Sequence, residues 1–147
     1  MVAGLTVSCA GEHNGEDVAG RDPTIAEREP QIGSMEVRAQ SSVERSEAWA
    51  LFFPTWEVEP GSPVVLPVDE EIKIVWRVTD GGDDSDFSVI DATGAVTPLL
   101  WGPNRQGGNW VRPGDERGTG WFLPSAGCWT LEVRRAIDVH TIVALAE

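Results

Sequence analysis

Gly120-Trp-Phe-Leu-Pro-Ser-Ala-Gly-Cys-Trp-Thr-Leu-Glu-Val133 is the stretch that decides how the last third of the chain folds. Its first apolar run is closed by Pro124 and Gly127, and a second run begins at Cys128. Proline fixes φ and glycine supplies the positive φ of a chain reversal, so the pattern predicts two strands joined by a tight turn. From Trp129 onward every second residue is apolar, which is typical of a strand with one buried face. The stretch therefore predicts antiparallel β-structure.

The same period-2 pattern recurs toward the N-terminus. Segment 71–79 is the clearest case, because Ile72, Ile74, Trp76 and Val78 share one face while the opposite face is mostly polar. Each tryptophan on an inward face buries about 200 Å², so Trp76 and Trp129 are expected to fill much of the core.

Further strands are expected wherever a short apolar or alternating run is bounded by turn residues. Segment 46–54 is a continuous apolar run, which suits a strand buried on both sides but equally a buried helix. The remaining expected strands are 35–40, 64–66, 86–91, 96–101, 121–123, 128–134 and 141–145. Eight or nine short strands with frequent turn signals predict an all-β protein, a single immunoglobulin-like antiparallel β-sandwich, with a closed β-barrel as the second choice.

Composition limits the classes of function. A chain of 147 residues is long enough for one domain with a real core. The net charge of −13 argues against nucleic acid and against docking on anionic lipid, because both require clustered Lys and Arg. No run approaches 18 apolar residues, so no helical membrane span is expected.

The N-terminal part of the chain has a different composition. Segment 1–11 resembles the end of a bacterial lipoprotein signal peptide, in which Leu5 precedes small residues and Cys9 would become acylated, although a charged region and a full apolar region are missing. An ordinary N-terminus with a stray cysteine is the alternative. Segment 12–33 is acidic and poor in apolar residues, which predicts a disordered linker, and the β-sandwich domain is expected over 34–147.

Four short motifs carry a resemblance to a known group. They are Lys73-Ile-Val-Trp-Arg77, Trp101-Gly-Pro103, Asn109-Trp-Val-Arg-Pro-Gly-Asp-Glu116 and Pro124-Ser-Ala-Gly-Cys-Trp129. Together they resemble a group of uncharacterised bacterial extracytoplasmic proteins, many of them predicted lipoproteins of high-GC bacteria. The resemblance implies an immunoglobulin-like domain outside the cytoplasm and implies no activity.

Residues that could carry chemistry are few. His140 and His13 have no evident partner, and no zinc ligand set is present, so no metal and no cofactor are expected. Asp80, Asp83, Asp84 and Asp86 could collect Ca²⁺, but a solvated turn is the better interpretation, since Asp and Gly commonly occupy turns.

The two cysteines of the chain could form one disulfide. Cys128 is expected to be a small packing group of the core beside Trp76 and Trp129, not bridged to Cys9, because Cys9 lies outside the expected domain.

The loop between Trp101 and Trp121 contains two neighbouring carboxylates that could act in hydrolysis. Asp115 and Glu116 are adjacent in sequence, and adjacent strand residues point apart, so a hydrolase using carboxylates is disfavoured. An ion pair of Arg112 or Arg117 with Asp115 or Glu116 that holds the loop is the more economical interpretation, and Arg112 with Asp115 is the pair we expect.

The loop between Trp101 and Trp121 is the main candidate for ligand binding. It is rich in Gly, Pro and charge, yet it contains Trp110. This ring could stack on a sugar or anchor a partner, or it could fold back and plug the end of the sandwich, which is the interpretation we favour. Trp101, Trp110, Arg112, Asp115 and Trp121 are therefore the candidate residues.

These observations predict a protein without enzymatic activity. The expected function is that of an exported binding or structural module of the cell envelope or the extracellular space, anchored as a lipoprotein through Cys9. The more specific alternative is a carbohydrate- or peptide-binding module that uses the Trp101–Trp121 loop for a glycan or protein partner.

Overall fold

A computed structural model describes residues 35–42, 46–53, 61–79, 85–105, 113–135 and 138–147. Segment 1–34, which contains the expected signal remnant and linker, lies outside the described residues, as do Trp110 and Arg112. The strands are β1 (Met35–Arg38), β2 (Gln40–Ser41), β3 (Ala48–Phe52), β4 (Val65–Leu66), β5 (Glu71–Val78), β6 (Asp86–Ile90), β7 (Val96–Thr97), β8 (Trp101–Arg105), β9 (Asp115–Phe122), β10 (Gly127–Arg135) and β11 (Asp138–Ala146).

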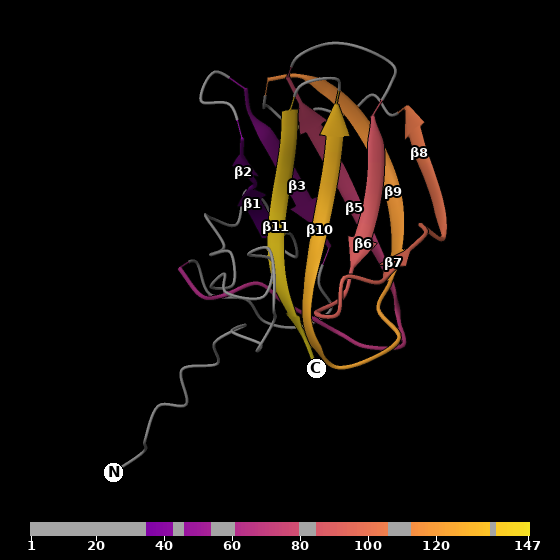
Figure 1. Cartoon of the computed structure of the whole chain (residues 1–147). Helices are drawn as coiled ribbons and strands as arrows, with labels where there is room; N and C mark the ends of the chain where they lie inside the picture. Colours follow the sequence, from indigo (N-terminus) through magenta and orange to yellow (C-terminus); the bar gives the residue numbers. More distant parts are fainter. Residues whose placement is uncertain (1–34, 43–45, 54–60, 80–84, 106–112, 136–137) are drawn as a thin grey trace.

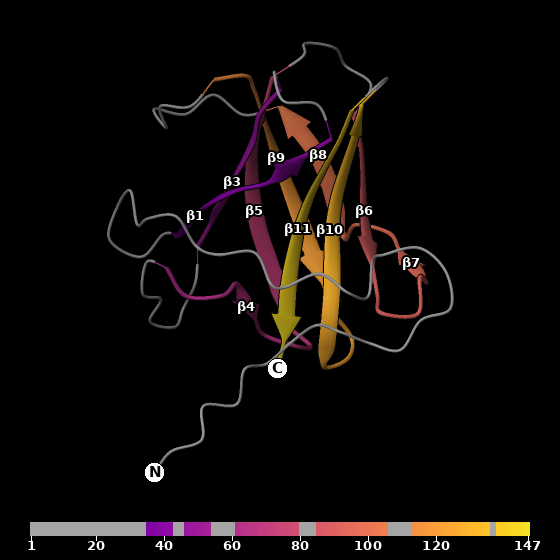
Figure 2. The same cartoon turned by 60° about the vertical axis from the view of Figure 1, so that its left-hand side comes forward.

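The strands form two sheets that pack face to face (Figures 1 and 2). The five-stranded sheet has the order β1-β3-β5-β9-β8, and the other sheet has the order β2-β11-β10-β6-β7, with β4 added parallel to β11. The described strands form two open sheets and no closed barrel, so the sandwich prediction is confirmed over the barrel.

The strand order is that of an immunoglobulin sandwich. The runs β3-β5-β9-β8 and β11-β10-β6 correspond to the ABED and GFC sheets, with chain order preserved from A to G. Strands β1 and β2, both labelled in Figure 1, follow one another in the chain but lie at the edges of different sheets. The fold therefore follows the expectation for antiparallel strands with short connections.

The interior holds a cluster of aromatic rings on strands of both sheets. Trp76 of β5 is fully buried and lies 5.9 Å from Phe87 and 6.1 Å from Trp121, measured between ring centroids. Trp129 and Leu131 of β10 are also buried. The alternation read in segment 71–79 matches β5, where the residues on the face of Trp76 are buried.

Two sequence interpretations of strand boundaries are wrong. Residues from Asp115 to Gly120 were expected to form part of a loop, but they form the first six residues of β9 and pair with β5. Segment 96–101 is not one strand, since β7 ends at Thr97 and β8 begins at Trp101. The glycines of β9 suggested a loop, but in an interior strand glycine also permits close approach by another group, which is its role at Gly120.

Candidate functional site

The outward face of the five-stranded sheet carries a row of aromatic and charged side chains. Alternation places Phe53, next to β3, on the same side as Lys73 of β5, and Lys73 pairs with Gly120, which in turn pairs with Trp101 of β8. Glu71 and Phe122, which pair with each other, lie beside this row. We call these side chains the outer aromatic surface: Phe53, Glu71, Lys73, Trp101 and Phe122.

Trp101 is held in one position by its neighbours. A Cβ added to Gly120 would overlap the indole ring of Trp101, so the ring lies directly against the backbone of Gly120. The indole Nε1–H donates a hydrogen bond to Glu71 Oε1 at 2.5 Å. The ring is half-buried, so it is positioned without being part of the core.

Phe53 and Lys73 continue the surface toward β3. The Phe53 side chain is 46% exposed, and Lys73 Nζ lies 5.5 Å from the centre of its ring, within the range of a cation–π contact. Neighbouring strands are about 4.8 Å apart, and Phe53 and Trp101 are separated by three strand spacings, so the surface extends over roughly 14 Å. Its length fits an extended ligand better than a single small molecule.

The edge of the five-stranded sheet is unfavourable for adding another strand. Strand β8 is one of the two edge strands, and it contains Pro103, which has no backbone N–H. Its pairing with β9 is also irregular between Trp101 and Asn104. Proline and bulges are features that protect sheet edges from further pairing, so the addition of another strand at β8 is disfavoured.

The structure separates the residues that the sequence grouped into one loop. Trp101 lies on the outer surface, whereas Trp121 is fully buried on the inward face of β9, where its Nε1–H donates to Thr119 Oγ1 at 2.5 Å. Asp115 is exposed, and its carboxylate lies 4.0 Å from Arg135 Nη2; the expected partner Arg112 lies outside the described residues, so that ion pair stays a prediction. Of the three candidates that the structure describes, Trp101 alone takes part in the outer aromatic surface, and Trp110 and Arg112 lie outside the described residues.

Four residues of the outer aromatic surface were not predicted from the sequence as site residues: Phe53, Glu71, Lys73 and Phe122. The signal was present in the alternation of segment 71–79, which places Lys73 opposite the buried face, but its pairing with Gly120 and Trp101 depends on register.

His140 has partners that the sequence did not reveal. This histidine is fully buried on β11, its Nδ1 lies 2.6 Å from Ser41 Oγ, and its Nε2 lies 3.7 Å from Asp138 Oδ2. Asp138 Oδ1 accepts a hydrogen bond from Ser42 Oγ at 2.7 Å. These contacts link Ser41 of β2 and the adjacent Ser42 to β11.

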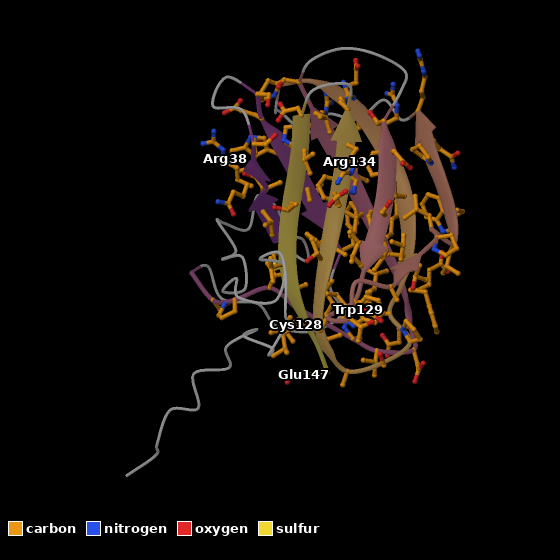
Figure 3. All side chains as sticks on the ribbon, in the orientation of Figure 1. Arg38, Cys128, Trp129, Arg134 and Glu147 are labelled. Carbon is orange, nitrogen blue, oxygen red and sulfur yellow. The ribbon has the colours of Figure 1, made fainter. Side chains whose placement is uncertain are left out.

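Cys128 differs from its expected role. It is only partly buried and lies on the outward face of β10, opposite to its neighbour Trp129, which is in the core (Figure 3). The expectation that Cys128 is an unbridged packing group is wrong, because Cys128 is disulfide-bonded. The chain has one other cysteine, Cys9, which lies outside the described residues.

The chain has no detected relatives, and its described residues form neither a metal site nor a helical membrane span. No family model, curated protein or solved structure matches the chain. Among the residues that the structure describes, no three His, Cys, Asp or Glu side chains converge to hold a metal ion, and Asp80, Asp83 and Asp84 lie outside them. None of the described segments forms a helix with the length and hydrophobicity of a membrane span.

Proposed function

We propose that the chain is a non-enzymatic binding module of the cell envelope, and that its outer aromatic surface binds a polysaccharide. The observation that carries the proposal is the position of Trp101, whose ring lies on Gly120 and is fixed by Glu71. A sugar ring has an apolar face of C–H groups that stacks on an aromatic ring, while its hydroxyls require polar partners at the ring edge. Glu71 and Lys73, both on β5, supply such partners on the side of Trp101 that faces the rest of the sheet.

The arrangement favours a polysaccharide over a peptide that adds a strand. Phe53 and Trp101 lie in one row across the sheet, so that successive sugar units could contact successive side chains. The irregular edge at β8 disfavours a peptide bound through its backbone. A structural module without a ligand is the competing proposal.

A location outside the cytoplasm is the second part of the proposal. Disulfides persist in exported proteins and are rare in the cytosol, so the disulfide-bonded Cys128 supports export. The resemblance of the motifs and of segment 1–11 to exported lipoproteins supports the same location. The lipid anchor that the sequence predicts at Cys9 requires a free thiol there, so it is not part of this proposal.

Binding to a panel of neutral and anionic bacterial polysaccharides tests the ligand, by affinity electrophoresis followed by calorimetry. We expect Trp101→Ala to weaken binding at least tenfold, which is about 1.4 kcal/mol. Leu100→Ala is the matched control, because Leu100 is 52% exposed next to Trp101 and lies outside the outer aromatic surface. Equal binding by wild type and Trp101→Ala, or no binding to any polysaccharide, would reject the proposal.

A further inference from the structure

The outward face of the six-stranded sheet carries a disulfide-bonded cysteine and, close to it, side chains that are buried although they point away from the core. Cys128 lies on this face and is disulfide-bonded. Thr130 and Val143, which pair with each other and share this outward face, are only 4% and 5% exposed. The other sheet packs against the inward face of β10 and β11, where Trp129 and Leu131 belong to the same core cluster as Trp76.

Side chains on an open sheet face are normally accessible on the solvent side. Trp129 and Leu131 alternate with Thr130 and are buried in the core, so burial of Thr130 cannot come from the interior of the sandwich. Arg134 of the same strand and the same outward face is exposed, which shows that the cover is local to the part of the face near Cys128.

We propose that segment 1–34 covers this face and is fastened there by a disulfide between Cys9 and Cys128. Cys9 is the one other cysteine of the chain, so it is the partner available within a single molecule. From Cys9 to Met35, where β1 begins, there are 26 residues, and an extended chain of that length reaches roughly 85 Å. Leu5 and Val7, close to Cys9, supply apolar side chains that match Val143.

The bond has a chemical consequence for the lipid anchor. Two thiols form the disulfide by giving up two protons and two electrons, which an oxidised protein dithiol of the exported compartment accepts. Once its sulfur is bonded to Cys128, Cys9 cannot carry the thioether of a lipid anchor. The inference therefore assigns Cys9 to the fold of an exported protein and removes the acylation that the sequence predicts. It does not depend on polysaccharide binding, because the outer aromatic surface is on the other sheet.

Peptide mapping of the full chain, exported to a bacterial periplasm and alkylated without reduction, tests the bond. We expect the tryptic peptide that ends at Arg21 to be linked to peptide 118–134, with neither cysteine alkylated. Cys9→Ser is the control, and it should leave Cys128 open to alkylation. Alkylation of both wild-type cysteines, a Cys128–Cys128 dimer, or diacylglycerol on Cys9 would each overturn the proposal.

Maleimide labelling of an added cysteine tests the cover. Val143→Cys, with the native cysteines kept, should react at least tenfold more slowly than Arg134→Cys in the same chain. In a Cys9→Ser/Cys128→Ser background the Val143→Cys site should become several-fold faster, while Arg134→Cys should not change. Equal rates at the two sites in the bridged chain, or no acceleration when the bridge is removed, would show that segment 1–34 does not cover this face.

Discussion

The two faces of the five-stranded sheet both carry tryptophan, but in different surroundings. On the inward face Trp76 is fully buried against Phe87 and Trp121. On the outward face Trp101 is half-buried, rests on Gly120 and bonds to an exposed glutamate. Trp76 is therefore a core residue, whereas Trp101 keeps a solvent-accessible side; Trp49, also on the outward face, is buried in a separate cluster with Leu51 and Val75.

The difference comes from the partners that each ring meets. The inward ring is surrounded by side chains of both sheets, so no part of it can contact a ligand. The outward ring is fixed on one side by backbone and at its edge by Glu71, which orders the ring before any ligand arrives. Ordering in advance reduces the entropy that binding would otherwise cost.

Truncating the two rings is the most direct test of this comparison and has the largest expected effect. Trp76→Ala should lower the free energy of unfolding by about 3–5 kcal/mol, because it removes a fully buried ring and leaves a cavity. Trp101→Ala should lower it by about 1 kcal/mol or less, since a half-exposed ring contributes little to stability. Urea denaturation of both variants measures the difference, and similar losses would remove the distinction between the two faces.

Gly120→Ala should have an intermediate effect that separates stability from binding. The added Cβ would overlap the Trp101 ring, which must then move away from the sheet. Overpacking of this kind costs roughly 1–3 kcal/mol, and the lower end is expected because the ring has a solvent side.

Binding then shows whether the position of the ring matters. Polysaccharide affinity of Gly120→Ala should fall to the level of Trp101→Ala even though the indole is still present. Gly94→Ala is a control in which the added Cβ meets no other group. Its positive φ of 88° predicts a small loss of stability, and its polysaccharide affinity should equal that of wild type. Affinity equal to wild type in Gly120→Ala would mean that the placement of Trp101 on Gly120 has no role in recognition.

Much of the sandwich could be read from the sequence, because period-2 alternation reports directly which face of a strand is buried. In β5 and β10 the apolar positions at every second residue are the core positions of the structure. Strand β9 could not be read in this way, since Gly118 and Gly120 interrupt its pattern and resemble loop residues.

The candidate site could be read only in part, because it depends on cross-strand register. Phe53, Lys73 and Trp101 are far apart in sequence and become neighbours through the pairing of β3, β5, β9 and β8. Local patterns carry no information on such pairing. Trp110 lies outside the described residues, and its role as a plug, with a loss of about 3–5 kcal/mol in Trp110→Ala, stays a prediction.

Substitution of Asp91 should give the smallest change in stability. This residue lies in a turn, outside both faces of the five-stranded sheet, and serves as a baseline for them. In the turn after β6 its Oδ1 accepts hydrogen bonds from Thr93 Oγ1 at 2.6 Å and from the backbone N–H groups of Thr93 and Ala95. The Thr93 hydroxyl is the main cause that holds the pKa of Asp91 below its ordinary value, and the backbone N–H groups add to it. Because the pKa is lowered in the folded state, the contribution to stability is present above the unfolded pKa and is lost as the pH falls through the folded pKa.

Asp91→Ala should therefore cost a few tenths of a kcal/mol at neutral pH, as expected for an exposed turn in water. The difference in stability between wild type and Asp91→Ala should shrink as the pH falls below about 4, the ordinary pKa of an aspartate. In this range the wild-type carboxylate becomes protonated and its hydrogen bonds lose their charge. Urea midpoints of wild type and Asp91→Ala at pH 7 and at pH 3 measure it. A loss as large as that of Trp101→Ala would show that local hydrogen bonds in an exposed turn count as much as the outer ring. A loss that stays constant with pH would show that the charge of Asp91 has no part in it.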